Sequence, residues 1–213
     1  ESPAKCKKIE EYLGSGYKCM ASFGHLRTLV DLQSIEVENN YKLNFTTLKE
    51  KDKQIFALKK AINMSDEVIL ASDDDREGEA IAWHICKLFG LPVNKTKRII
   101  FHEITKPAIL KSLESPIKIN MNIVHAQHAR QCLDILVGFK VTPLLWKHIC
   151  PYYSKGLSAG RCQSPALRLI YDNACEITNC KGDQTNTISG CFTKLNTRFI
   201  LNKTIKDENE VND

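Results

Sequence analysis

The alternation of apolar and polar positions divides the first half of the chain into strands and helices that follow one another. Residues 68–71 form a short apolar run typical of a buried strand, and 98–101 form another. Between them, the apolar positions of 80–89 recur at the spacing of one helix face. Further helices are predicted at 3–13, 51–61 and 105–113, with a short strand at 17–23 and a tight loop at 24–27. This alternation predicts an α/β fold with a mainly parallel sheet and helices on both faces.

The pattern becomes mostly helical after residue 115. One amphipathic helix is predicted over 122–139, a second from Thr142-Pro143 to 149, and a third over 164–177. The first of these should bury an apolar stripe made of Ile123, Ala126, Ala129, Leu133 and Leu136. Two strands of a hairpin follow, at 187–192 and 198–201. We therefore expect an α/β domain over 1–115, a helical unit over 116–178, and the beginning of a β domain over 179–213.

Composition narrows the class of protein. Of the 213 residues 43% are hydrophobic and 26% charged, which is enough for a folded core. The net charge of +5 is too small to indicate a nucleic-acid partner by itself. Nine cysteines occur without any Cys-x-x-Cys spacing, so we expect reduced thiols and an intracellular protein rather than a zinc ribbon. No apolar run approaches the length of a membrane span, and no signal peptide is visible.

The most informative segment is the acidic loop between the strand at 68–71 and the helix that follows it. Carboxylates stand at positions 73, 74, 75, 77 and 79. Open α/β sheets bind their ligands at the carboxyl ends of their strands. Crowded carboxylates repel one another unless a cation or neighbouring Arg and Lys offset them, and hard oxygen ligands suit Mg²⁺. The alternative is a solvated acidic loop that only caps the helix.

Several blocks of sequence, in order, resemble the type IA DNA topoisomerases, toward their bacterial-type branch. Three look like the Toprim domain of that family: Glu1-Ser2-Pro3-Ala4-Lys5, Ser22-Phe23-Gly24-His25-Leu26-Arg27, and Asp73-x-Asp75-Arg76-Glu77-Gly78-Glu79. Others look like its helical DNA-binding domain: Ala129-Arg130, Leu133-Asp134, Val137-Gly138-Phe139-Lys140-Val141, Leu145-Trp146, and Leu157-Ser158-Ala159-Gly160-Arg161-Cys162-Gln163-Ser164. The resemblance covers roughly residues 1 to 170.

The resemblance implies an ATP-independent reaction that relaxes negatively supercoiled DNA. One strand is cut through a 5′-phosphotyrosine, another strand passes, and the break is resealed. The family's nucleophilic tyrosine lies in a later domain, and the six tyrosines of this chain stand in other contexts. The first Toprim strand would precede Glu1. We therefore expect an N-terminal fragment that is inactive alone but binds Mg²⁺ and single-stranded DNA, as a monomer.

The resemblance also implies roles for individual acids and bases. Catalytic positions would be Glu1, Lys5, Asp73, Asp75, Arg76 and Glu77. The metal ligands would be Glu1, Asp73, Asp75 and Glu77. Other interpretations stay open, because Glu1 could be a helix-terminus charge, Lys5 a solvated side chain, and Arg76 an internal salt bridge within the acidic loop.

DNA contacts are implied along the second unit and at one loop of the first. They are His25, Arg130, Gln131, Asp134, Phe139, Trp146, Ser158, Ala159, Gly160, Arg161, Cys162 and Gln163. Many relatives carry Arg where this chain has Gln131, so that contact should be weaker. Phe139 and Trp146 could equally pack in a core. Small residues before Arg161 would let backbone N–H groups approach a phosphate.

Two other functions compete with this interpretation. Primases and some nucleases share the acidic Toprim set, but they lack the Ser-Ala-Gly-Arg-x-Gln block after a helical unit. A non-catalytic DNA-binding protein would use the acids only structurally. The sequence does not distinguish cytoplasm, nucleoid or nucleus.

Overall fold

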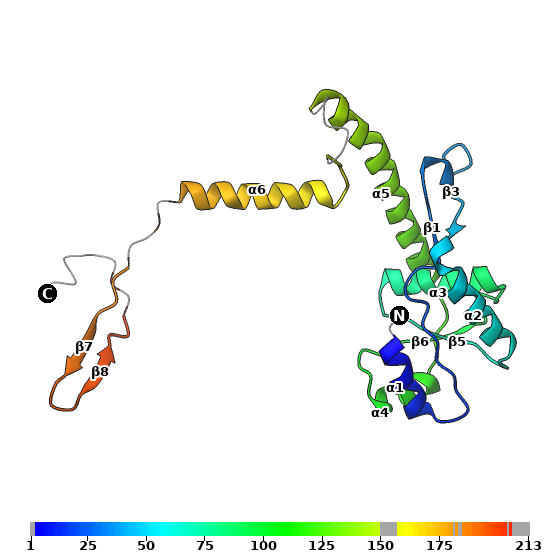
Figure 1. Ribbon diagram of the computed structural model, residues 1–213, viewed down its shortest axis with the longest axis horizontal. Helices are drawn as coiled ribbons and strands as arrows, with labels where there is room; N and C mark the ends of the chain where they lie inside the picture. The colour runs from blue at the N-terminus through cyan, green and yellow to red at the C-terminus, as the bar shows by residue number, and fades with distance from the viewer. Residues whose placement is uncertain (1–2, 150–156, 181, 183–184, 204, 206–213) are drawn as a thin grey trace. The chain divides into compact units, whose positions relative to one another are not determined.

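The computed structural model describes residues 3–149, 157–180, 182, 185–203 and 205, which form two compact units (Figure 1). The first unit extends from Glu1 to Arg161 and the second from Cys162 to Asp213. The three-part division at residues 115 and 178 stays a prediction, since the segment after 115 is compact with the residues before it.

The first unit combines helices with short strands, and the α/β class is confirmed. Its helices are α1 (Pro3–Leu13), α2 (Asp52–Asn63), α3 (Arg76–Phe89), α4 (Lys106–Glu114) and α5 (Met121–His148), with 3₁₀ turns at Leu32–Ser34 and Lys49–Lys51. Its strands are β1 (Arg27–Thr28), β2 (Ile35–Glu36), β3 (Lys42–Leu43), β4 (Thr46–Thr47), β5 (Ile69–Ala71) and β6 (Lys97–Ile99).

The parallel pair β5–β6 is the centre of the first unit. Leu70 lies opposite Arg98 in the register, and α3 connects the two strands. Ile117 adds an antiparallel bridge to β6 by exchanging two backbone hydrogen bonds with Arg98, of 2.9 and 2.7 Å. The buried cluster beside this sheet consists of Leu70, Ala82, Cys86, Ile119 and Val124. The remaining pairs, β1–β4 and β2–β3, are antiparallel.

The strand predicted at 17–23 is wrong, because this segment pairs with no strand in the described chain. Side chains of α2 and of the 3₁₀ turn before it bind the backbone of this segment instead. The Gln54 amide donates to the carbonyl of Ala21, and Lys51 Nζ donates to the carbonyl of Phe23 over 2.8 Å. Phe23 and Gly24 then turn the chain with positive φ angles of 56° and 87°.

The predicted break before Pro143 is also wrong, since α5 is one helix from Met121 to His148. Proline removes one N–H donor from a helix interior, which usually ends or kinks it. Here the helix is held on both sides of that position. The Thr142 hydroxyl accepts from the Ala159 N–H at 3.1 Å, and Trp146 Nε1 donates to the Leu157 carbonyl at 2.8 Å.

The buried face of α5 differs from the predicted stripe. Val124, Gln127 and Cys132 are buried, whereas Leu133 is 49% exposed. A polar residue thus occupies the inner face, because Gln127 has a hydrogen-bond partner there. An apolar pattern cannot reveal such a position.

The second unit contains α6 (Gln163–Asn179) and the hairpin formed by β7 (Ser189–Phe192) and β8 (Thr197–Ile200). The helix predicted at 164–177 and the predicted hairpin are both confirmed. None of the helices in the described ranges combines the length and apolarity that a membrane crossing requires.

Candidate active site and nucleic-acid interface

The acidic loop joins the carboxyl end of β5 to the start of α3. Asp73, Asp74 and Asp75 are exposed there. Asp75 is the N-cap of α3, and its Oδ1 accepts from the Gly78 N–H at 2.7 Å. The cap satisfies a backbone donor that the helix leaves unpaired, and the helix dipole favours the negative charge. Asp75 therefore does cap the helix, and the cap uses only one of its two carboxylate oxygens.

A buried arginine, which the sequence did not identify as a site residue, binds the acidic loop through hydrogen bonds. Arg98 is 1% exposed. Its Nε donates to Ser72 Oγ at 2.9 Å, and its Nη2 donates to the Asp73 carbonyl at 2.7 Å. Its Nη1 lies 2.7 Å from Glu79 Oε2. The sequence signal that could have identified Arg98 is its position next to the apolar strand residues Ile99 and Ile100. A charged residue in a buried strand needs a partner of opposite charge.

Gly78 provides a second constraint on the acidic loop, because its backbone lies in close contact with the backbone of Asp73. A Cβ at this position would stand 2.3 Å from the Asp73 carbonyl oxygen and 2.9 Å from the Asp73 nitrogen. Both are backbone atoms, so no side-chain rotation could relieve the clash. Glycine lets the first turn of α3 lie directly against the backbone of Asp73.

Glu77 connects the acidic loop to two other segments. Its Oε2 lies 3.0 Å from His25 Nε2, which must carry the proton since a carboxylate only accepts, and it accepts from Gln127 Nε2 at 3.1 Å. Its Oε1 lies 3.9 Å from Arg130 Nη1. The structure thus brings together His25, Glu77 and Arg130, three of the predicted site residues, and adds Gln127.

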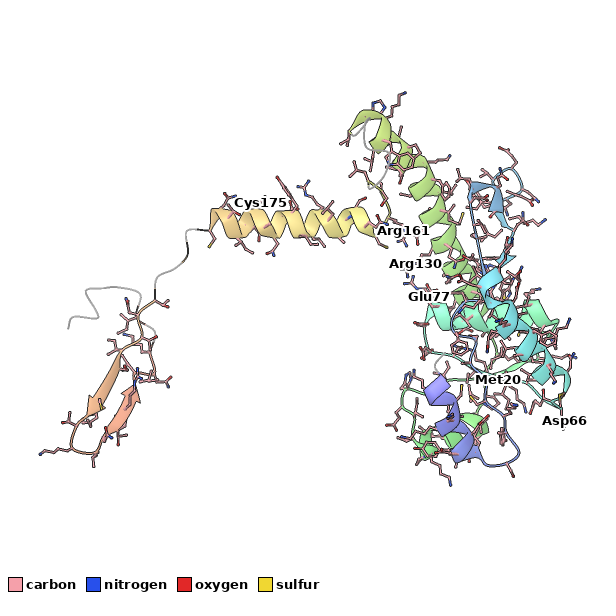
Figure 2. The ribbon with its side chains drawn as sticks, viewed as in Figure 1. Met20, Asp66, Glu77, Arg130, Arg161 and Cys175 are labelled. Carbon is pink, nitrogen blue, oxygen red and sulfur yellow. The ribbon has the colours of Figure 1, made fainter. Side chains whose placement is uncertain are left out.

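The contacts continue along α5 toward the loop at 157–161. Arg130 Nε lies 3.9 Å from Asp134 Oδ2, and Arg161 Nε donates to Asp134 Oδ1 at 2.8 Å. Figure 2 shows the labelled Glu77, Arg130 and Arg161 following one another beside α5. We call this series Glu77–Arg130–Asp134–Arg161 the charge chain. It joins the acidic loop to the loop whose small residues precede Arg161.

A cluster of aromatic and histidine rings supports the base of this region. The ring centroid of His84 is 4.5 Å from that of Phe45 and 4.9 Å from that of Trp83, and Trp83 is 4.7 Å from His128. Burial, with smaller contributions from His128, Arg27 and His25, lowers the pKa of His84 to about 3. Burial and His125 lower the pKa of His128 to about 4. Both rings are therefore neutral at physiological pH.

The remaining predicted residues lie apart from these contacts or outside the described residues. Glu1 belongs to the latter. Lys5 is exposed on α1 and makes no ion pair within the described part of the chain, while Arg76 is likewise exposed. Gln131 is half-buried on α5.

The aromatic and loop positions have separate surroundings. Phe139 and Trp146 are 48% and 41% exposed, so they are not packed in a core. Ala159 is buried, whereas Cys162 is exposed and Gln163 begins α6. Ser158, Gly160, Arg161 and Gln163 all make contacts.

Asp73 and Asp75 of the acidic loop supply oxygen ligands of the kind that Mg²⁺ takes in proteins. Across the described ranges, no three His, Cys, Asp or Glu side chains lie close enough together to hold a metal. Asp73 and Asp75 nevertheless present carboxylates at the surface of a backbone that Arg98 and Gly78 hold in place. Mg²⁺ in proteins often takes only one or two carboxylates and keeps several waters. The four-carboxylate set stays a prediction.

Two family models match successive parts of the chain. A Toprim domain model matches residues 1–104, and a DNA topoisomerase model matches residues 118–213. The acidic loop, Glu77 and Arg98 lie within the Toprim match. The other members of the charge chain, Arg130, Asp134 and Arg161, lie within the DNA topoisomerase match.

A solved structure supports the same relationship. The full-length topoisomerase I from Thermotoga maritima is similar with a TM-score of 0.73 and 38% sequence identity, over 89% of this chain. The chain spans 31% of the length of that protein.

Proposed function

Because the chain belongs to the type IA DNA topoisomerase family, we propose that it contributes the Toprim and DNA-binding parts of an enzyme that cuts, passes and reseals one DNA strand. The phosphodiester energy would be kept in a phosphotyrosine bond, so the reaction needs no ATP and can relax negatively supercoiled DNA. The nucleophilic tyrosine would lie outside residues 1–213. We propose that the partner of the chain is DNA, which it binds as a single strand, as a monomer, in an intracellular compartment.

The acidic loop would hold Mg²⁺ beside the scissile phosphate. Asp73 and Asp75 are the exposed carboxylates that would bind it, with Glu1 as a further ligand. When bound, Mg²⁺ offsets phosphate charge and orients the 3′-hydroxyl during resealing. Glu77 is engaged by His25, Gln127 and Arg130, so its contribution would be to orient those groups as well as to add charge.

The DNA strand would follow α5. Arg130 and Arg161 supply cationic donors for phosphates, and the exposed rings of Phe139 and Trp146 can stack on bases. Lys5 would contact the phosphate and help protonate the 3′-oxygen that leaves. His25, held by Glu77, would contact the strand near the cleavage point.

The charge chain is the observation that carries this proposal. The ion pairs of Glu77–Arg130–Asp134–Arg161 connect the acidic loop to the cationic groups proposed to bind the strand, within one unit. A phosphate that binds Arg161 or Arg130 competes with Asp134 and Glu77 for the same guanidinium groups. Strand binding would thereby rearrange the carboxylate at the edge of the acidic loop.

Metal binding can be tested on the 213-residue chain by thermal denaturation during a Mg²⁺ titration. The melting temperature should rise with Mg²⁺, because a ligand that binds only the folded state stabilises it. Asp73→Asn should remove most of the rise. Asp74→Asn makes the same charge change in the same loop and should keep it. An equal response in both variants would exclude Asp73 from the metal site.

The position of the nucleophile can be tested with supercoiled plasmid. The 213-residue chain should bind single-stranded oligonucleotides but leave the plasmid supercoiled with Mg²⁺ present. Relaxation by this chain alone would show that it contains its own nucleophile, and the proposed arrangement would then be wrong.

A further inference from the structure

The outer face of α2 and the C-cap residue that follows it carry two large apolar side chains that are mostly exposed in the described part of the chain. Phe56 is 73% exposed and Met64 is 77% exposed. With Lys59, Lys60 and Asn63 they line a shallow hollow of about 350 Å³. Their spacing places them on one face of the helix. We call these five residues the α2 patch.

The core side of the same helix is already formed by other residues. Leu58 is buried, and Ile55 and Ile62 are half-buried. They recur at helical spacing on the face opposite the α2 patch. The folding of the first unit therefore accounts for the inner face of α2 and leaves the exposed phenyl ring and thioether unexplained.

The α2 patch is positively charged. Lys53, Lys59 and Lys60 are exposed on this face, and none of them forms an ion pair with another described residue. Asp52 is the one acid on the same face of the helix. A ligand of matching charge would be anionic, with a flat apolar group for the hollow.

The α2 patch is also separate from the acidic loop. Met64 precedes the amino end of β5, whereas Asp73–Asp75 follow its carboxyl end. Figure 2 shows the labelled Asp66, just beyond Met64 in the chain, on the far side of the first unit from the labelled Glu77. A ligand at the α2 patch would not occupy the site proposed above.

We infer that the α2 patch is an accessory binding site for single-stranded nucleic acid. Phe56 offers an open ring face on which a base stacks, and Lys59 and Lys60 reach the phosphates on either side. Asn63 supplies an amide that can both donate to and accept from a base edge. An acidic peptide fits less well, because peptide grooves are usually formed between two elements or along a sheet edge, and a single helix lines this hollow.

The test measures binding of a fluorescein-labelled oligodeoxythymidine to the 213-residue chain by fluorescence anisotropy over a salt series. Phe56→Ala should weaken binding about thirtyfold, the middle of the range for loss of one stacked base. The double variant K59E/K60E should reduce the slope of log K against log salt by about 1.4, since each phosphate contact to a single strand contributes about 0.7. Photo-cross-linking of a bromodeoxyuridine oligonucleotide should label the α2 peptide.

Matched controls separate this site from the main one. K111E/K118E makes the same charge change on exposed lysines away from α2 and should leave the slope nearer that of the wild type. All substituted side chains are exposed, so circular dichroism should show unchanged melting. Unchanged affinity and slope in both α2 variants would overturn the inference. So would binding of an acidic peptide with a terminal phenylalanine in place of the oligonucleotide. Loss of Mg²⁺ binding in Asp73→Asn bears on the acidic loop alone.

Discussion

The guanidinium of Arg98 and the carboxylate of Glu79 form an ion pair of 2.7 Å whose two side chains are only 1% and 3% exposed. Arg98 stands on β6 and Glu79 in the first turn of α3, so the pair ties the sheet to the helix that carries the acidic loop. Glu79 also accepts from the Asn120 N–H at 2.5 Å, which adds the start of α5. One buried pair thus sets the relative position of the three segments that build the site.

Arg98→Met should destabilise the chain by about 3–5 kcal/mol, because it leaves the Glu79 carboxylate buried without its partner. Urea unfolding followed by circular dichroism measures the change. Lys97→Met is the matched control on the neighbouring residue. Lys97 pairs with Glu67 at 2.8 Å, but both side chains are about half exposed, at 49% and 53%, so its loss should cost less than about 1 kcal/mol. Equal effects would contradict the structural role of Arg98.

Gly78→Ala should lower the free energy of unfolding by about 1–3 kcal/mol, as overpacking against rigid atoms does. The new methyl group would meet the backbone of Asp73 at 2.3 Å. The displaced loop should also bind Mg²⁺ more weakly. Gly138→Ala, inside α5, meets only the Ala159 carbonyl at 3.8 Å and should stabilise by about 0.5–1 kcal/mol. Chemical denaturation of both variants tests the contrast.

Two substitutions at Asp75 separate its capping role from its charge. Asn is as good an N-cap as Asp, whereas Ala loses the cap and should cost about 1 kcal/mol. Asp75→Asn should therefore keep the stability of the wild type without Mg²⁺ but lose part of the Mg²⁺-dependent rise in melting temperature. A full rise in Asp75→Asn would mean that Asp75 serves only as a cap.

Stability should fall as the pH is lowered from 6.5 toward 4. The pKa of His84 in the folded chain is about 3 and that of His128 is about 4, against an ordinary value of 6.5. In this window the unfolded chain binds more protons than the folded one, so stability is present above 6.5 and is lost below it. His84 contributes a slope of up to about 1.4 kcal/mol per pH unit.

The histidine responsible can be identified by substitution. His84→Phe keeps an aromatic ring beside Phe45 and Trp83 but cannot bind a proton, so its stability should depend less on pH. His102→Gln changes an exposed histidine and should leave the wild-type dependence. Urea unfolding at a series of pH values measures both. A slope unchanged in His84→Phe would rule out His84 as the group that titrates.

Arg161→Ala should weaken binding of single-stranded DNA across sequences and reduce the salt slope by about 0.7, as expected for one lost phosphate contact. Because Arg161 pairs with Asp134 at 2.8 Å in the free chain, Asp134→Asn should have the opposite effect and tighten binding. Anisotropy titrations at several salt concentrations measure both. A slope unaffected by Arg161→Ala would remove Arg161 from the DNA contacts.

Periodicity and short motifs were sufficient for most of the helices, for one hairpin and for the family. The helices at α1, α2, α3, α4 and α6 and the β7–β8 hairpin follow from local patterns, because the spacing of apolar residues and the identity of capping residues are local properties. The acidic residues could likewise be located on a strand-to-helix loop from their immediate neighbours. Their order along the chain was enough to indicate the type IA topoisomerases.

Only tertiary contacts determined that α5 is continuous through Pro143 and which residues hold the acidic loop in place. A local reading ends a helix at Pro143, yet contacts of Thr142 and Trp146 with residues 157–159 keep it continuous. Arg98 and Gln127 look like surface residues until partners distant in sequence, Glu79 and Glu77, account for their burial. The reason is physical: the cost of burying a polar group depends on partners that the fold supplies, which no local pattern contains.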